Sequence, residues 1–335
     1  MAFSLGKLLK PFFRISTDAF RDMAAKRYGA QEDMYRTWQQ FEPVAGALVQ
    51  GLSITLDDNR VEVLMPRINA LDIEVRGVAY EGVGMGLTLL DNFFPWKNRL
   101  QAFVEGPGAS YICLIYIGAG LVLPRIPGRP ERFLARLDPL LRWFVMDGYG
   151  FYEGFFSLQR SVEEHVIPSR LFGYARRAFD HGLGRSIWFS TGANVERICA
   201  ALATFPQARQ ADLWGGIGMA CAYAAGVVDR ATIETLLTIA GPSSPQFAVG
   251  VALAAKFRQQ AGTSAPHTEL ACEVVYGLSG GEVAHLTDVT RENLPVDAAE
   301  PAYEIWRQRI AAHYTASVAS VGTASGESEP RKVRQ

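Results

Sequence analysis

The chain has 335 residues, of which 49% are hydrophobic, so it is long enough to bury a large core and is not disordered as a whole. Its 33 lysine and arginine residues nearly balance its 34 aspartate and glutamate residues, which leaves a formal net charge of -1. This balance provides no broad electropositive surface for a phosphate backbone, so nucleic acid is not expected as a partner.

Four cysteines lie far apart in the sequence, and no pair has the spacing of a metal site or a redox motif. They are Cys113, Cys199, Cys221 and Cys272. We therefore expect reduced thiols, a cytoplasmic protein and no resident metal or other cofactor.

The first 60 residues are expected to form an N-terminal helical arm. Its start, MAFSLGKLLKPFFRI, has Lys7, Lys10 and Arg14 among its apolar residues and lacks the continuous apolar core of a signal peptide. Contact of this stretch with a membrane surface is an alternative to packing on the body of the protein. Helices are predicted at DAFRDMAAKRY and at FEPVAGALVQGLSI, the second broken at Pro43.

The central part of the chain, from about Val61 to Gly262, contains an internal repeat. The segment VEVLMPRINALDIEVRGVAYEGVGMG from Val61 aligns without gaps with VERICAALATFPQARQADLWGGIGMA from Val195. The segment LDPLLRWFVMDGYGFYEG lies between them and matches the first at a constant offset. These segments indicate three copies of one unit of roughly 67 residues, each a double helical hairpin.

Glycines recur in these copies at a spacing close to the ~34 residues that is typical of helix-turn-helix repeats. They are Gly82, Gly118, Gly148, Gly182, Gly216 and Gly250. Because a glycine inside a helix costs up to about 1 kcal/mol relative to alanine, their recurrence indicates that neighbouring helices approach closely. The sequence therefore predicts an all-α fold of three double-hairpin units, stacked as a superhelix or a closed α-toroid.

The helical repeat domain is expected to span residues 61–314. The tail at 315–335 has no apolar periodicity and is predicted to be disordered. Two uncharged runs, Gly106 to Pro124 and Leu213 to Val228, are interpreted as buried helices rather than membrane spans, because they are short for a span and the first contains a proline and several glycines.

Several long segments resemble the hallmark segments of a bacterial family of unknown function. They are DGYGFYEGFF from Asp147, HGLGRSIWFSTGANVERI from His181, DLWGGIGMACAYAAG from Asp212 and HTELACEV from His267. That family includes the UnbL-like accessory proteins encoded with enediyne polyketide synthases, and it also occurs in other specialised-metabolite gene clusters. The resemblance implies a role in making a polyketide or another apolar natural product, with a polyketide synthase or other cluster enzymes as partners. It supplies no catalytic residues to carry over.

The densest group of chemically active side chains surrounds the second copy of the repeat. The candidate catalytic residues are Asp147, Asp180, His181, Glu153 and Tyr149. A carboxyl group buried among tyrosines and apolar residues has a raised pKa and can act as a general acid, as the protonation of a polyene requires. The alternative is that Asp147, Asp180 and Asp212 cap the glycine-rich helices that follow them.

A second set of residues is predicted to bind the substrate. It consists of Tyr152, Trp143, Phe151, Arg185, Trp214, Glu81 and Asp212. The aromatic members would line a cavity for an apolar chain and stabilise a cation through their ring faces, and Arg185 would suit an anionic group. The alternative is a core of large side chains that fills the space between stacked repeats.

The segment Asp57-Asp58-Asn59-Arg60-Val61-Glu62 resembles the acidic magnesium motif of terpene synthases, with Asp57, Asp58 and Glu62 as candidate ligands. No second metal motif follows at a recognisable spacing, and Asp-Asp-Asn is also a common turn.

The sequence favours a cofactor-independent isomerase or cyclase, or a binder, of a linear apolar polyene or isoprenoid chain, with acid catalysis by Asp147 or Asp180 in an aromatic-lined helical cavity. A non-catalytic helical-repeat scaffold for a polyketide synthase or carrier protein is a second class, and a Mg²⁺-dependent terpene cyclase is a third. A closed apolar cavity with converging carboxylates would favour the enzyme, whereas a polar concave surface would favour the scaffold.

Overall fold

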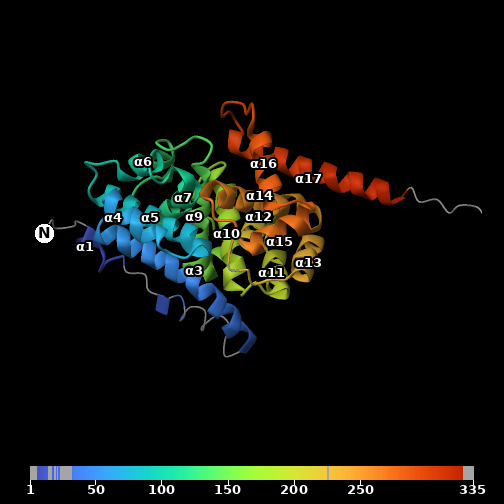
Figure 1. Cartoon of the computed structure of the whole chain (residues 1–335), viewed down its shortest axis with the longest axis horizontal. Coiled ribbons are helices and arrows are strands. Elements are labelled where there is room, and N and C mark those ends of the chain that lie inside the picture. Colours follow the sequence, from blue (N-terminus) through green and yellow to red (C-terminus); the bar gives the residue numbers. More distant parts are fainter. Residues whose placement is uncertain are drawn as a thin grey trace, which may run out of the picture.

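The computed structural model describes residues 6–13, 17, 18, 20, 22, 32–224 and 226–326. Over these residues every regular element is a helix and no strand occurs (Figure 1). The prediction of an all-α fold is therefore confirmed.

The helices follow one another with short connections. In chain order they are α1 (Gly6–Leu9), α3 (Glu32–Asp57), α4 (Val61–Asn69), α5 (Ile73–Phe93), α6 (Arg99–Val104), η1 (Ala109–Tyr111), α7 (Ile112–Val122), η2 (Leu123–Arg125), α8 (Pro130–Leu134), α9 (Trp143–Phe156), η3 (Gln159–Glu163), α10 (Ala175–Ser190), α11 (Val195–Ala203), α12 (Gln207–Tyr223), α13 (Arg230–Ala240), η4 (Gly241–Ser243), α14 (Ser244–Ala261), α15 (Pro266–Tyr276), α16 (Gly280–Arg291) and α17 (Ala302–Gly326).

Eight helices form a row in which each packs against the next member, in the order α3, α5, α7, α9, α10, α12, α14 and α16. Helices α11, α13 and α15 contact one another in sequence beside this row (Figure 1). Helices α12 and α14 run in the same direction, because Arg258 near the end of α14 donates a hydrogen bond of 2.7 Å to the carbonyl oxygen of Tyr223, the last residue of α12. The core of the protein lies along the row.

Paired glycines set the distance between neighbouring helices of the row. A Cβ atom at Gly84 of α5 would collide with the carbonyl oxygen of Ile115, and one at Gly118 of α7 would collide with that of Glu81. In each pair, one glycine lies against the carbonyl group three residues before the other. The same arrangement joins Gly51 to Gly82, Gly120 to Gly148, Gly150 to Gly182, Gly184 to Gly216 and Gly218 to Gly250. The close approach predicted from the recurring glycines is confirmed.

Helices that are not neighbours in the row also contact one another. Phe144 of α9 packs edge-on against Phe257 of α14, with ring centroids 5.0 Å apart. Arg258 of α14 donates a hydrogen bond of 2.8 Å to the carbonyl oxygen of Glu74 on α5. Side chains from several helices therefore converge in one interior.

Two details of the N-terminal arm and the tail differ from the sequence analysis. Pro43 does not break a helix but lies inside α3, where the remaining backbone hydrogen bonds and the packing of α3 on α5 hold the helix together. Helix α17 continues to Gly326, past Thr315, where the disordered tail was expected to begin. The helix predicted at DAFRDMAAKRY lies mostly outside the described residues, as do residues 327–335.

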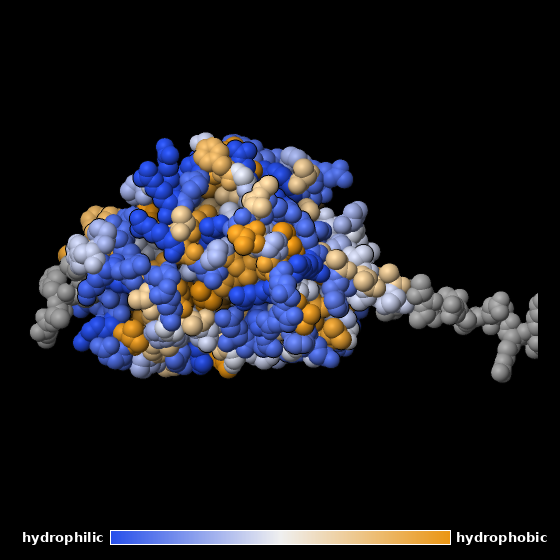
Figure 2. Space-filling view, turned by 90° about the horizontal axis from the view of Figure 1, so that it is seen from above, coloured by the Kyte–Doolittle hydropathy of each residue, from blue (hydrophilic) through white to orange (hydrophobic). Residues whose placement is uncertain are grey.

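The two uncharged runs provide α7 and α12, and both are buried in the protein as predicted, from Cys113 to Val122 and from Asp212 to Tyr223. A different stretch, Arg230–Ala261, is long and apolar enough to cross a membrane by length and composition. It is not one continuous helix, because it comprises α13, η4 and α14 and turns at Gly241, whose φ is 52°. Seen from above, the surface carries a band of hydrophobic side chains among hydrophilic ones (Figure 2).

Candidate functional site

A small cavity of about 50 Å³ lies where α3, α5, α9, α10 and α12 meet. Most of its wall is aromatic or aliphatic, and the large side chains include Phe20, Trp38, Phe41, Phe151, Phe155 and Phe189. Three polar side chains also line it, namely Glu81 of α5, Arg185 of α10 and Tyr223 of α12. The cavity thus combines an apolar wall with a few polar groups, as small-molecule sites do.

Arg185 lies between two buried carboxylates from different helices. Its Nη1 forms a short ion pair with Oδ1 of Asp147 on α9, and its Nη2 lies 3.6 Å from Oε1 of Glu81. The other oxygen of Asp147, Oδ2, is 2.6 Å from Nδ1 of His181. No residue of this cluster is more than 7% exposed.

The glycine pairs explain how these side chains come together. Gly182 lies directly on the carbonyl group of Asp147, so α9 and α10 touch through their backbones at this point. His181 and Arg185 are one helical turn apart on α10, so their side chains share a face, and both reach Asp147. Gly150 completes the pair by lying on the carbonyl group of Phe179.

The two carboxylates respond differently to the same environment. Burial raises the pKa of Asp147, but the Arg185 charge and the contacts with His181 outweigh burial and hold this pKa below its usual range. Burial raises the pKa of Glu81 to about 7, since the more distant Arg185 offsets burial only in part and Asp147 raises the pKa further. Near neutral pH, Asp147 is therefore ionised while Glu81 exchanges a proton.

Tyr223 crosses from α12 to α5. A Cβ atom at Gly77 would collide with the Tyr223 hydroxyl group, so glycine at this position makes room for it. Burial raises the pKa of Tyr223 to about 12, and the hydroxyl group therefore keeps its proton.

Most of the chain matches the model of one protein family. The family model described as "Protein of unknown function (DUF1702)" matches residues 6–314. The chain belongs to the DUF1702 family. No curated protein and no solved structure matches the chain. The resemblance to a family of unknown function is thus confirmed.

Five of the residues singled out in the sequence lie together in the DUF1702 structure. They are Glu81, Asp147, Phe151, His181 and Arg185. The guanidinium carbon of Arg185 lies 5.2 Å from the centroid of the Phe151 ring. His181 contacts Asp147 without lining the cavity, and its Nε2 has no hydrogen-bond partner among the described residues.

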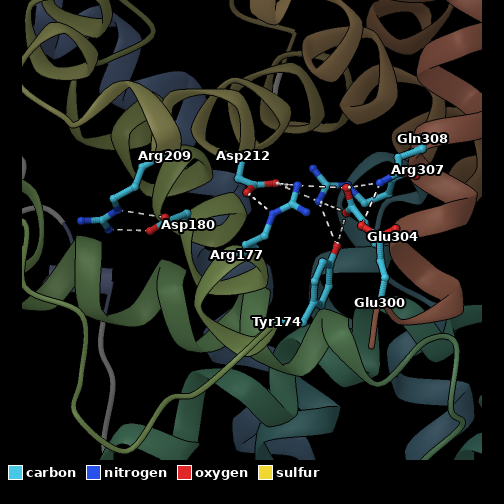
Figure 3. Close-up of polar contacts among 9 residues, drawn as sticks. All are labelled: Tyr174, Arg177, Asp180, Arg209, Asp212, Glu300, Glu304, Arg307 and Gln308. Carbon is cyan, nitrogen blue, oxygen red and sulfur yellow. Dashed lines mark hydrogen bonds and ion pairs between the residues drawn. The ribbon is translucent and has the colours of Figure 1, made fainter. Parts of the chain in front are cut away.

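Two other predicted acids lie in separate ion pairs, which Figure 3 shows side by side. Asp180 pairs with Arg209, whose Nε is 2.9 Å from Oδ2, and burial raises the pKa of Asp180 to about 6 against the opposing effect of Arg209. Asp212 pairs with Arg177 at 2.8 Å and with Arg307 at 2.9 Å. Burial raises the pKa of Asp212, but Arg307 and Arg177 outweigh it and lower the pKa.

The capping interpretation of these three aspartates is wrong. Asp147, Asp180 and Asp212 are the fifth, sixth and sixth residues of α9, α10 and α12, whereas a capping residue precedes its helix. Each of these helices already begins before its aspartate, at Trp143, Ala175 and Gln207 respectively. Side-chain caps occur instead at other residues, such as Asp72 before α5 and Asn194 before α11.

The remaining predicted residues pack elsewhere, and none lines the cavity. The hydroxyl group of Tyr149 accepts a hydrogen bond of 2.8 Å from Arg170. Tyr152 packs on Phe156, Trp143 on Tyr174 and Trp214 on Phe247, with centroid separations of 4.7, 4.9 and 6.3 Å. Glu153 is half-buried on α9.

The acidic segment at the end of α3 is engaged in ion pairs with basic residues. Asp57 lies 2.6 Å from Lys10, Asp58 lies 2.6 Å from Arg60, and Glu62 is exposed in the first turn of α4. Across the part of the chain that the structure describes, no group of three His, Cys, Asp or Glu side chains is placed to hold a metal ion.

The contributions of α3 and of Tyr223 on α12 to the cavity were not predicted from the sequence. Trp38 and Phe41 belong to α3, which was assigned to a separate arm, and Tyr223 was not singled out. One signal was present, because Gly51 precedes Gly82 by nearly the same interval as the later glycines. Extending the glycine spacing backwards would have placed α3 in the row.

Proposed function

We propose that this DUF1702 protein binds an apolar unsaturated chain and rearranges it by acid catalysis, with Glu81 as the proton donor. The observation that carries this proposal is that Glu81 bears the one carboxyl group which the described residues place on the wall of an aromatic cavity, and that this group is protonatable. A general acid works best when its pKa lies near the working pH, and burial brings the pKa of Glu81 to about 7.

Asp147 has a different role in this proposal. Its carboxylate is held ionised by Arg185 and His181 and does not line the cavity, so it is unsuited to donate a proton to a ligand there. It positions Arg185 instead, and its negative charge helps to keep Glu81 protonated.

In the proposed reaction, Glu81 first donates a proton to the substrate and then accepts a proton from it. The π electrons of one double bond take the Glu81 proton, a C–H bond forms, and the neighbouring carbon becomes a cation. The ring faces of Phe151, Phe155 and Phe189 stabilise that cation. Loss of a proton from an adjacent carbon to the Glu81 carboxylate forms a new double bond, so the product is an isomer of the substrate. Attack by a second double bond before this loss gives a ring.

The size of the cavity sets a condition on binding. A volume of about 50 Å³ holds only a few atoms of a ligand, since one water molecule takes up roughly 30 Å³ in the liquid. A longer chain must therefore displace aromatic side chains when it enters. Among the large rings of the lining, Phe20 precedes α3 in the chain. The others, Trp38, Phe41, Phe151, Phe155 and Phe189, belong to helices of the row.

We also propose a pathway, a cellular location and a repeat architecture for the protein. The resemblance of four long segments to the UnbL-like proteins supports a role in specialised-metabolite biosynthesis, acting on a polyketide or isoprenoid chain beside a polyketide synthase or other cluster enzymes. The four unpaired cysteines, three of them buried, support a cytoplasmic location. The regular glycine pairs support a superhelix of three double-hairpin units of roughly 67 residues.

The test is turnover in deuterated water. Purified full-length protein is incubated with farnesol, squalene and linear polyenes, with and without Mg²⁺, and products are analysed by mass spectrometry. Because the acid proton exchanges with solvent, each isomer formed should carry deuterium at the protonated carbon.

Two variants separate the candidate acids. Glu81→Gln should abolish deuterium incorporation, whereas Asp180→Asn, which removes a buried carboxylate outside the cavity, should retain it. Circular dichroism spectra establish that both variants are folded. Absence of turnover by the wild-type protein with every substrate, or full turnover by Glu81→Gln, would contradict the proposal.

A further inference from the structure

Two side chains that line the cavity carry hydrogen-bond donors with no partner among the residues that the structure describes. These donors are the hydroxyl group of Tyr223 and Nε1 of Trp38. The two side chains are only 5% and 6% exposed. Folded proteins pair nearly all of their buried polar groups, so two unpaired donors on one cavity point to a ligand that accepts hydrogen bonds.

The charges on the cavity wall disfavour an anionic acceptor. Arg185 already faces two carboxylates, Asp147 and Glu81, so it offers no surplus positive charge. Arg258 lies over the Tyr223 ring, 4.2 Å from its centroid, but it does not line the cavity, and it donates to the carbonyl oxygens of Glu74 and Tyr223. A carboxylate or phosphate entering the cavity would lose its hydration and meet Glu81 on a wall whose cation, Arg185, is already paired with Asp147.

From these contacts we infer that the ligand carries a neutral carbonyl oxygen, of a ketone or ester, which the Tyr223 hydroxyl group binds beside Trp38. This inference rests on the proposed function for the reaction at Glu81, but it concerns which ligand binds. Contacts with α5 fix the position of this carbonyl oxygen relative to Glu81. The Tyr223 hydroxyl group lies against Gly77, and Glu81 is one turn further along the same helix face, a rise of roughly 5.4 Å. The carbonyl group is therefore a few bonds from the double bond that Glu81 protonates.

Three probes of similar size and different polarity test the inference. Acetophenone has a neutral carbonyl group, ethylbenzene has no acceptor, and benzoate is an anion. Each is larger than the cavity and must displace the same aromatic side chains to enter, so their affinities can be compared. Their affinities for the full-length protein are measured by ligand-observed NMR titration at pH 6.5. Acetophenone should bind at least about tenfold more tightly than ethylbenzene, because a site built around hydrogen-bond donors rejects an analogue that leaves them unpaired. Benzoate should bind more weakly than acetophenone.

Variants assign the preference to one hydroxyl group. Tyr223→Phe should reduce acetophenone binding to the level of ethylbenzene and leave ethylbenzene unchanged. Tyr149→Phe is the matched control, because that hydroxyl group is paired with Arg170 outside the cavity, and it should bind the three probes as the wild-type protein does. Melting temperatures verify that both variants are folded.

The outcomes separate this inference from the proposed catalysis. Equal affinities for acetophenone and ethylbenzene, tightest binding of benzoate, no binding of any probe, or an unchanged preference in Tyr223→Phe would each overturn it. Glu81→Gln should keep the preference for acetophenone. A wild-type protein that prefers acetophenone but never incorporates deuterium would support the ligand class and refute the acid catalysis.

Discussion

Glu81 links the cavity to the pH dependence of stability. Its pKa in the folded protein is about 7, against 4.5 for the unperturbed side chain, because burial disfavours the charged form. Below pH 4.5 the group is protonated in both states. As the pH rises towards 7, the unfolded chain ionises first, so stability is lost across this interval. The 2.5-unit difference corresponds to about 3 kcal/mol.

Glu81→Gln removes this titration. We expect the free energy of unfolding of the variant, relative to that of the wild-type protein, to rise by about 2 kcal/mol between pH 5 and pH 8. Urea denaturation at the two pH values measures the difference. Parallel pH profiles of the two proteins would show that Glu81 has an ordinary pKa.

Asp147 sets the proton affinity of Glu81 from the other side of Arg185. In Asp147→Asn the negative charge that raises the pKa of Glu81 is lost, and Arg185 keeps Glu81 as an ion-pair partner. We expect the pKa of Glu81 to fall and the pH at which turnover is half-maximal to shift to lower values. Removing one partner of a buried ion pair also costs about 3 to 5 kcal/mol of stability.

A pH–rate profile from the deuterium assay, together with urea denaturation, checks both expectations. Asp180→Asn is the control, because Asp180 contacts Arg209 rather than Arg185, and its half-maximal pH should match that of the wild-type protein. An unchanged midpoint in Asp147→Asn would mean that the two carboxylates are not coupled through Arg185.

At the level of helices, the glycine pairs hold the candidate site together. Gly182 lies on the carbonyl group of Asp147, so Gly182→Ala must push α10 away from α9 where Asp147, His181 and Arg185 meet. Overpacking of this kind costs about 3 kcal/mol, and it should also lower turnover because the cluster is displaced. The matched control is Gly281→Ala in α16, where no heavy atom lies within 4 Å of the added Cβ atom.

Urea denaturation compares the two glycine variants. Because alanine favours a helix over glycine, Gly281→Ala should be neutral or more stable by up to about 1 kcal/mol. Equal stability of Gly182→Ala and the wild-type protein would mean that the helices of the row have room to separate.

The helices and their spacing were predictable from the sequence because glycine is costly in a helix and its recurrence has few explanations. Their boundaries were less so. Asp147 precedes a glycine-rich run, which suggested a cap, but α9 already begins at Trp143 because the apolar residues before Asp147 also pack in the core. Glu81 on α5 and Arg185 on α10 lie close together although three successive helix contacts separate α5 from α10 along the row. Their proximity therefore depends on a bend of the row as a whole. No local pattern records such a bend.

Over the whole molecule, the C-terminal helix is tied to the row through buried charges. Arg307 of α17 pairs with Asp212 at 2.9 Å and with Glu304 at 3.0 Å, and Arg177 of α10 reaches the same two carboxylates (Figure 3). Tyr174 donates a hydrogen bond of 2.6 Å to Glu304. Nearby, Tyr303 of α17 packs edge-on against Phe144 of α9, with ring centroids 5.3 Å apart. Helix α17 therefore supports the helix that carries Asp147.

Arg307→Met tests this support. The variant leaves Asp212 and Glu304 with Arg177, whose side chain is 42% exposed, as their remaining cation. Uncompensated buried carboxylates should cost about 3 to 5 kcal/mol, and hydrogen exchange should show α17 losing protection before α5 does. Arg309→Met is the control on the same helix, because Arg309 donates only to backbone carbonyl groups near the end of α16, and it should change stability by no more than about 1 kcal/mol. If α17 opened no earlier than α5 in Arg307→Met, its attachment would rest on apolar packing at Tyr303, Trp306 and Ile310, and the charge cluster would be dispensable.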